Sequence, residues 1–208
     1  LQFFCVAGVV KGVSDSAPSL SKLDLLAKGT GAVIYDEGGN ELQTLSTSSE
    51  QKEYVKLYKI PACVQYAFVA AVDSRFYEHK GVDLSAIFQE FVDDLSEKDQ
   101  VKSTSTITQQ LLRNQVIWKG NGSSVYEKIT RKIQEQYLAV QLEQKLDKEQ
   151  ILEYYLNTIN LGQNAIGVQN ASMRYFNKDI SQLSISEAAV LAGTQQNPTD
   201  DNPTGPGK

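Results

Sequence analysis

The pattern of hydrophobic and polar positions changes along the chain, from a short hairpin-like stretch to helical periodicity. An apolar run at 32–35 and a mixed run at 42–45 flank a Gly/Asn-rich stretch at 36–40, an arrangement typical of a small β-hairpin. From residue 61 onward, apolar residues recur every three to four positions, which favours helices. The pattern predicts a mainly α chain with a minor β element before the helices.

The helical part divides into segments with recognisable starts. Pro61 suits the first turn of a helix. Further helices are predicted at 83–95, 106–117, 123–144, 148–158, 163–176 and 186–194. Asp147 and Ser184 precede two of these segments and are residue types that cap helix N-termini. Most of the chain should therefore form one helical domain.

The two ends differ in composition from this helical body. Residues 1–10 are apolar except for Gln2 and Gly8, but a bilayer-spanning helix needs about 20 residues. We interpret this segment as the remnant of a transmembrane helix, with an ordinary buried helix as the alternative. Residues 11–28 are then a stalk, 29–200 the domain and 201–208 a Pro/Gly-rich linker or tail. This organisation places the domain beside a membrane.

Composition bounds the class of protein. The chain has 208 residues, of which 41% are hydrophobic and 22% charged, enough for a proper core and unlike a disordered or collagen-like chain. Its net charge of −5 argues against a nucleic-acid partner. Two distant cysteines and a single histidine indicate neither a disulfide framework nor a zinc site.

The negative total hides one basic region. Residues 101–135 sum to +4, so the rest of the chain sums to −9. A local excess of Lys and Arg in an acidic protein indicates a site for an anionic group rather than a general property of the surface.

Four polar stretches stand out, and the first two each have two interpretations. The titratable residues at 72–83 suit an acid/base site, or a solvated helix end capped by Gly81. The stretch 105–114 opens with hydroxyl and amide side chains and carries Arg113 one turn beyond Gln109. It suits either an anion-binding helix start or a capped helix with an exposed polar face.

The other two stretches are also open to a structural interpretation. Arg131 and Glu135 are one helical turn apart, so they form either an ordinary surface pair or part of the basic site. The stretch 151–178 carries aromatic residues and glycines that favour packing over catalysis. Taken singly, none of the four stretches decides the function.

Together and in this order, the stretches resemble the motifs of glycosyltransferase family 51. This is the peptidoglycan transglycosylase domain of class A penicillin-binding proteins and monofunctional transglycosylases. The family pattern E-D-x-x-F-x-x-H-x-G-x-D aligns with 72–83, G-[GA]-S-T-I-T-Q-Q-x-x-K-N with 103–114, R-K-x-x-E with 131–135, I-L-E-x-Y-L-N with 151–157, and G-V-x-x-A-[AS]-x-x-Y-F with 167–176. The resemblance covers about residues 28–200.

The resemblance implies a fold, a substrate and a location. The fold would be the lysozyme-like glycosyltransferase 51 fold, mainly α, with a small N-terminal β-hairpin element and a membrane-proximal jaw. The domain would bind lipid II and polymerise glycan strands, releasing undecaprenyl pyrophosphate. It would lie on the extracytoplasmic face of the bacterial membrane behind a single-pass anchor, with the growing glycan strand as partner and a transpeptidase domain following in the parent chain. A lysozyme-like hydrolase is disfavoured because the matched motifs belong to the transferase.

The resemblance also implies roles for individual residues. The substrate-binding residues would be Ser105, Thr108, Gln109, Gln110, Arg113, Arg131, Lys132, Phe76, His79, Glu153 and Asn157. Arg113 would hold phosphate where the family usually has lysine. Glu135 would be the second acidic residue of catalysis and would contact Mg²⁺ or another divalent cation bridged to the pyrophosphate.

The sequence departs from the family at the catalytic base. The position of the motif-one glutamate is occupied by Val72, which cannot accept a proton, and positioned base catalysis contributes roughly 10²–10⁴-fold. Asp73 is adjacent, but successive helical residues point about 100° apart, so Asp73 could substitute only with a rearranged backbone. The sequence therefore predicts either an impaired transglycosylase or an inactive lipid II-binding or scaffolding member of the family.

Overall fold

The structure is a computed structural model. It describes residues 11–18, 20, 32–35, 41–45, 53–95, 105–115, 124–198 and 203. The predicted membrane-anchor remnant at 1–10 lies outside these residues, as do half of the predicted stalk at 11–28 and all of the predicted tail except residue 203. Within the described part of the chain, no helix is long and apolar enough to cross a membrane.

Two short antiparallel strands precede the helices. Strand β1 (Ala32–Tyr35) pairs antiparallel with β2 (Glu41–Leu45), so that Ala32 faces Leu45. The predicted turn at 36–40 lies outside the described residues.

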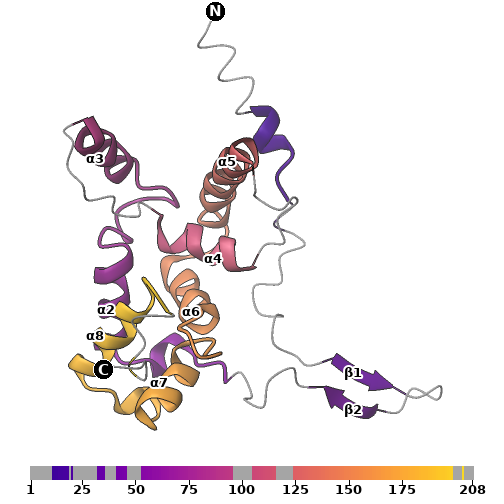
Figure 1. Cartoon of the computed structure of the whole chain (residues 1–208), viewed down its shortest axis with the longest axis vertical. Helices are drawn as coiled ribbons and strands as arrows, with labels where there is room; N and C mark the ends of the chain where they lie inside the picture. Colours follow the sequence, from indigo (N-terminus) through magenta and orange to yellow (C-terminus); the bar gives the residue numbers. More distant parts are fainter. Residues whose placement is uncertain are drawn as a thin grey trace, which may run out of the picture.

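The rest of the described chain consists of helices and the loops that connect them (Figure 1). The elements are the 3₁₀ helix η2 (Leu57–Lys59), α2 (Ala62–Val72), α3 (Leu84–Leu95), α4 (Ile107–Gln115), α5 (Val125–Leu142), α6 (Lys148–Thr158), α7 (Val168–Phe176), the 3₁₀ helix η3 (Ile180–Gln182) and α8 (Ile185–Thr194). The predicted mainly helical class is confirmed, and most predicted boundaries agree within a few residues.

One predicted boundary is wrong. The helix expected over 163–176 begins only at Val168, because the chain before it turns sharply. Gln163 and Asn164 have positive φ, and Asn160 forms an isolated antiparallel bridge with Ile166. The turn closes at Gly167, whose φ is +82° and where a Cβ would lie 2.8 Å from the backbone oxygen of Asn157. Only glycine fits this position.

Side-chain caps fix the starts of two predicted helices. The Asp147 side chain accepts a hydrogen bond from the backbone N–H of Gln150, whose side chain accepts one from the N–H of Asp147 in return. Ser184 and Glu187 form the same reciprocal arrangement at the start of α8. Both predicted caps are confirmed, and each satisfies donors that a helix start leaves unpaired.

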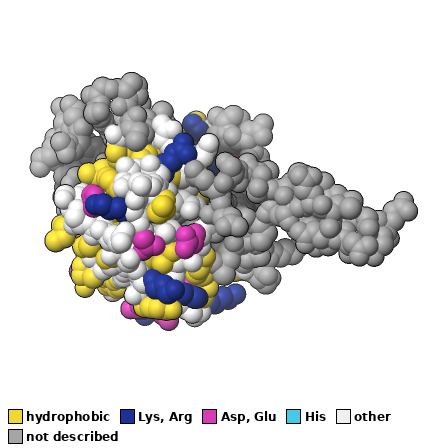
Figure 2. All heavy atoms as spheres, turned by 90° about the horizontal axis from the view of Figure 1, so that it is seen from below, with side chains coloured by type: hydrophobic (Ala, Val, Ile, Leu, Met, Phe, Trp, Pro, Cys, Tyr) yellow, Lys and Arg dark blue, Asp and Glu magenta, His cyan; other side chains and the backbone are white. Residues whose placement is uncertain are grey.

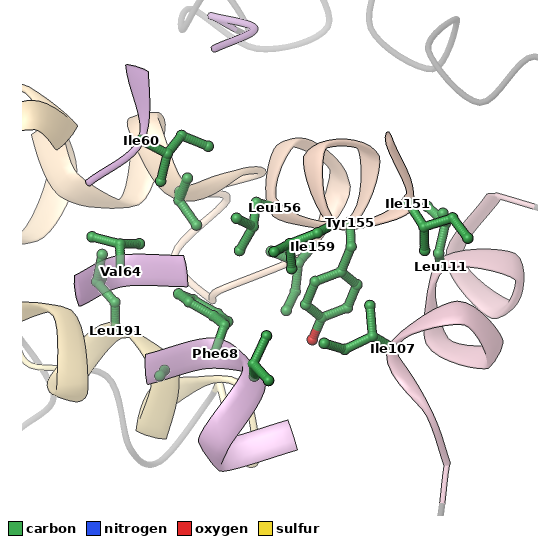
Figure 3. Packing of buried hydrophobic residues seen from close by; sticks show 14 of the residues in the cluster. Ile60, Val64, Phe68, Ile107, Leu111, Ile151, Tyr155, Leu156, Ile159 and Leu191 are labelled. Carbon is green, nitrogen blue, oxygen red and sulfur yellow. The ribbon is translucent and has the colours of Figure 1, made fainter. Parts of the chain in front are cut away.

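The core joins helices that are far apart in sequence (Figure 3). Helix α2 packs beside α8, and its Phe68 ring meets Tyr155 of α6 edge to face, with the ring centroids 6.4 Å apart. Helix α4 packs against α6. Its Ile107 and Leu111 side chains are fully buried, as are those of Phe68 and Tyr155. This packing places the start of α4 next to the end of α2, where two of the sequence motifs meet.

The face seen in Figure 2 has a mixed character. Its described side chains show Lys/Arg and Asp/Glu interspersed among hydrophobic residues. A surface on which both signs of charge alternate produces no strong field of one sign. The basic residues of the predicted site are those that α4 and α5 bring together.

Candidate functional site

The buried carboxylate of Asp73 joins the end of α2 to the start of α4. It accepts hydrogen bonds from Nε2 of His79, at 3.0 and 3.1 Å, and from the backbone N–H of Ile107 at 3.0 Å. The Asp73 side chain is only 4% exposed, and an acidic group is favourable at a helix N-terminus. Asp73 therefore ties the first sequence motif to the second and already has a partner for each carboxylate oxygen.

The start of α4 is capped by its own side chains. The Thr106 hydroxyl accepts from the N–H of Gln109 at 3.2 Å and donates to the carbonyl of Gly81 at 2.7 Å. The Gln109 side chain accepts from the N–H of Thr106 at 3.0 Å. Of the two interpretations of this stretch, the structure supports the capped helix for its first turn. The N–H of Ile107 donates to Asp73 and that of Gln109 donates to Thr106.

Gly81 does not cap α2, as one interpretation of the first stretch held. Helix α2 ends at Val72, and Gly81 lies later, in the loop before α3. Its φ is +91°, and a Cβ there would lie 2.6 Å from the backbone carbonyl of Ala139 in α5. The glycine thus allows this loop to pack directly on α5.

Two cations and a carboxylate meet between α4 and α5. Arg113 donates to both oxygens of Glu135, at 2.9 and 3.1 Å, and its guanidinium also donates to the Ser105 hydroxyl at 2.9 Å. The ammonium of Lys132 donates to the same hydroxyl at 2.9 Å and lies 3.8 Å from Glu135. We call Ser105, Arg113, Lys132 and Glu135 the basic cluster.

The basic cluster directs positive charge outward. The Glu135 side chain is 2% exposed, whereas those of Arg113 and Lys132 are 42% and 40% exposed. The hydrogen bonds to Glu135 raise the pKa of the Arg113 guanidinium, so this group stays charged. With two cations and one carboxylate, the cluster keeps a net positive charge and suits a phosphate group.

The partner of Glu135 differs from the one that helical spacing suggested. Glu135 pairs with Arg113 of α4 rather than with Arg131, one turn before it on α5. Arg131 lies on the same helix and is half-buried. The interpretation of Arg131 and Glu135 as an ordinary surface pair is therefore wrong. Glu135 points into the protein, where α4 packs against α5, and so meets Arg113 instead.

Other predicted substrate-binding residues have structural partners. Thr108 is fully buried and donates to Glu143 at 2.5 Å. The Gln110 side-chain oxygen accepts from Tyr155 at 3.2 Å and from Gln195 at 2.8 Å. Their role in substrate binding stays a prediction, since these contacts already explain why a hydroxyl and an amide are found there.

Phe76 and Lys148 form a further contact under the first motif. Phe76 is fully buried, and the ammonium of Lys148 lies 4.4 Å from the centroid of its ring. Lys148 also pairs with Glu143 at 2.7 Å. This arrangement indicates that Phe76 supports the loop from within, and its predicted contact with substrate stays untested.

Glu153 and Asn157 lie on α6 and face the segment before α2. Asn157 accepts from the N–H of Val55 at 2.8 Å and donates to its carbonyl at 2.9 Å, while Glu153 accepts from the N–H of Leu57 at 2.8 Å and from the Tyr54 hydroxyl. Burial raises the pKa of Glu153, but the hydrogen bonds from Tyr54, Leu57 and Lys56 outweigh it and lower the pKa overall. The structure does not bring these two residues to the basic cluster.

A divalent cation has no ready-made site among the described residues. They contain no group of three or more His, Cys, Asp or Glu side chains that could hold a metal ion. Both oxygens of Glu135 already accept from Arg113, and two cations stand beside it. These residues alone do not fit a metal ion, and Mg²⁺ at Glu135 stays a prediction that depends on an anionic ligand.

The sequence did not predict two sets of polar contacts in and around the first motif. Arg75 forms two hydrogen bonds of 2.9 Å with Asp83, and Glu143 joins Thr108 to Lys148. Neither set has a helical spacing that would reveal it. The Arg75–Asp83 pair could have been suggested only by an arginine and an aspartate on either side of a glycine-containing turn, and that pattern is too common to predict a contact.

These features define the class as a mainly helical domain with a positively charged cluster between two helices. The chain belongs to the transglycosylase family, whose profile matches residues 38–206, as the motifs predicted. Penicillin-binding protein 1A of Clostridium tetani is 39% identical over 203 residues, which are 95% of this chain and 25% of that protein. The same protein of Clostridium perfringens strain 13 is 40% identical (93% and 28% covered), and penicillin-binding protein 1A/1B of Bacillus subtilis is 38% identical (95% and 21%). The chain spans about a quarter of the length of these relatives.

Proposed function

We propose that this chain is the peptidoglycan glycosyltransferase domain of a larger penicillin-binding protein and that it binds lipid II through the basic cluster. The observation that carries the proposal is the convergence of Arg113 and Lys132 on one hydroxyl, that of Ser105, each at 2.9 Å. Family membership supplies the reaction class, and the cluster supplies a place for the pyrophosphate of the donor.

The reaction makes specific demands on these residues. The 4-hydroxyl oxygen of the acceptor sugar forms a bond to C1 of the donor sugar, the bond from C1 to the pyrophosphate oxygen breaks, and the configuration at C1 inverts. Negative charge grows on the departing lipid pyrophosphate, which Arg113 and Lys132 would stabilise. Glu135 holds Arg113 in a fixed orientation, so the guanidinium needs little reorganisation when the charge develops.

Position 72 carries no group that could accept the proton of the attacking hydroxyl. Val72 is a partly buried apolar residue that packs against the core, and the carboxylate of Asp73 is occupied by His79 and Ile107. The proton would pass to water, and turnover would be slow. The same observation favours a second candidate, a family member that binds lipid II or acts as a scaffold without polymerising it.

The setting of the domain follows from the same proposal. Lipid II is a membrane lipid, so the domain would work on the extracytoplasmic face of a bacterial membrane, held by a single-pass anchor. The relatives are about four times as long as the matched region, which leaves room for a transpeptidase domain in the parent protein. A divalent cation would bind here together with the pyrophosphate, and no step above depends on it.

Direct binding of labelled lipid II to the chain tests the proposal. Arg113→Glu should weaken binding by at least about tenfold, because hydrogen bonds to charged groups are worth roughly 1.5–3 kcal/mol. The matched control is Arg174→Glu, a charge reversal at an exposed arginine of α7, which should leave the affinity unchanged. Absence of lipid II binding, or equal affinities for the chain and Arg113→Glu, would overturn the proposal.

A further inference from the structure

The side-chain amide of Gln110 in α4 is held by hydrogen bonds at both of its ends. Its nitrogen donates to the backbone carbonyl of Ser105 at 3.3 Å. Its oxygen accepts from the Tyr155 hydroxyl at 3.2 Å and from the side-chain nitrogen of Gln195 at 2.8 Å. The segment before α4, helix α6 and the turn that ends α8 therefore meet at this one amide.

The direction of the Gln110 amide follows from the chemistry of its partners. The Ser105 carbonyl can only accept a hydrogen bond, so the nitrogen of Gln110 must face it. The oxygen of Gln110 is then left for donors, and Gln195 must turn its own nitrogen toward that oxygen. Loss of the Gln195 donor would remove the shorter of the two bonds that hold this oxygen in place.

Ser105 is the point at which the Gln110 amide reaches the basic cluster. The Ser105 hydroxyl accepts from Arg113 and from Lys132, each at 2.9 Å, while its carbonyl accepts from Gln110. Helix α4 begins at Ile107, so Ser105 precedes the helix and its regular hydrogen bonds do not fix this residue. The contact with Gln110 therefore helps to set where the shared hydroxyl lies.

Gln195 is itself held in place by the segments around it. It is half-buried at the end of α8, and α8 packs against α2. Three residues later, the Pro198 carbonyl oxygen lies so close to Gly162 that a Cβ there would be only 2.3 Å from it. A donor that is fixed by packing loses little conformational entropy when it bonds. Gln195 can therefore orient the amide of Gln110.

Tyr155 supports the same oxygen from the core. Its ring is fully buried and extends from α6 toward Ile107 (Figure 3). Burial raises the pKa of its hydroxyl, so the hydroxyl stays protonated and can donate. Replacing Tyr155 would open a cavity in the core and destabilise the whole domain. Gln195 is only half-buried, so its donor can be removed with far less effect on the fold.

We propose that Gln195 is a positioning residue of the donor site. It orients the Gln110 amide and, through it, Ser105, whose hydroxyl Arg113 and Lys132 share. The inference rests on the proposed binding of lipid II at the basic cluster. Gln195 lies outside all five sequence motifs, and it is 85 residues from Gln110 in the chain.

Binding of labelled lipid II to the 208-residue chain and to Gln195→Met tests the inference. Methionine is of similar length but donates no hydrogen bond, so we expect the affinity to fall by at least about threefold, as for the loss of one neutral hydrogen bond. Gln196→Met is the matched control, since Gln196 is the next residue and is exposed. It should bind as the unaltered chain does.

A double variant separates positioning from other effects of the substitution. Gln110→Met removes the acceptor, so adding Gln195→Met to it should weaken lipid II binding no further. An effect of Gln195 that reached the site by another route would appear in both backgrounds. Losses that add in the double variant would therefore contradict the proposed role.

The carbonyl ¹³C resonance of Ser105 reports the same contact without any ligand. It should shift in Gln195→Met and in Gln110→Met and stay unchanged in Gln196→Met. An unmoved resonance in Gln195→Met, or an affinity equal to that of the unaltered chain, would overturn the inference.

Failure of the proposed function gives a different result. If the unaltered chain binds no lipid II, the basic cluster is not a donor site, whereas the Ser105 resonance still shows whether Gln195 positions Ser105. Circular dichroism shows whether each variant is folded, and Gln195→Ala replaces Gln195→Met if the latter does not fold.

Discussion

Arg113 and Glu135 depend on each other unequally. The arginine side chain is 42% exposed and can be solvated without its partner, whereas the carboxylate is 2% exposed and cannot. Removing one member of a buried ion pair is costly chiefly because the other charge is left in a medium of low dielectric constant. The cost should therefore be larger when the exposed member is removed.

Two substitutions measure this asymmetry. Arg113→Met should lower the free energy of unfolding by about 3–5 kcal/mol, since it leaves Glu135 buried without its two hydrogen bonds from Arg113. Glu135→Gln should cost less, about 1.5–3 kcal/mol, the value of hydrogen bonds to a charged group. Urea unfolding of the three proteins gives both numbers. Equal costs, or a larger cost for Glu135→Gln, would contradict the burial argument.

At the scale of elements, the loop after α2 is held against α5 at Gly81. An alanine there would need a positive φ of +91° and a Cβ only 2.6 Å from the backbone of Ala139. Helix α8 contains a contrasting glycine, Gly193, where an added Cβ would meet nothing within 4 Å. The two positions separate the effect of a close backbone contact from the general effect of glycine.

Gly81→Ala should destabilise the domain by at least about 2 kcal/mol, the strain of an unfavourable backbone conformation with a steric clash added. Gly193→Ala should stabilise it by about 0.4–1 kcal/mol, because alanine restricts the unfolded chain and fits a helix. Thermal unfolding of both variants provides the measurement. A similar change in both would show that the loop does not rest on α5 as described.

The start of α8 should make stability depend on pH. Hydrogen bonds from Lys178 and from Ser184 lower the pKa of Glu187 from 4.5 to about 2. A carboxyl whose pKa is lower in the folded state contributes stability above its unfolded pKa and loses it as the pH falls through the folded value. The stabilising contribution of Glu187 should therefore be complete above about pH 5 and decline between pH 4.5 and 2.

Glu187→Gln tests this pH dependence. The difference in unfolding free energy between the chain and the variant should shrink as the pH falls from 5 toward 2. Lys178→Met removes the partner, which lies 2.6 Å away, and should reduce the dependence over the same interval. A difference that stays constant across the interval would show that Glu187 makes no such contribution in solution.

At the scale of the whole molecule, helices were predictable wherever local signals were strong. The caps at Asp147 and Ser184 are encoded within four residues, so the sequence alone located them. The start of α7 was not predictable, because the turn before it depends on the backbone of Gly167 approaching Asn157. That contact exists only once the chain has folded.

The candidate site shows the same limit. The motifs identified Arg113, Lys132 and Glu135 as members of one site, but spacing along α5 suggested the wrong partner for Glu135. The pairing of Glu135 with Arg113 joins residues from two helices, and helical spacing carries no information about a neighbouring helix. Asp73 is a similar case, because its hydrogen bond to Ile107 depends on where α4 begins.

The most direct test of the account is the rate at which labelled lipid II is polymerised by the chain, by Val72→Glu and by Val72→Gln. The account holds that the basic cluster binds the donor and that the missing carboxylate at position 72 limits turnover. Val72→Glu should therefore be at least about 100-fold faster than the chain. Val72→Gln, which is of similar size but accepts no proton, should stay slow. Equal rates for the chain and Val72→Glu would contradict the claim that Val72 limits the reaction.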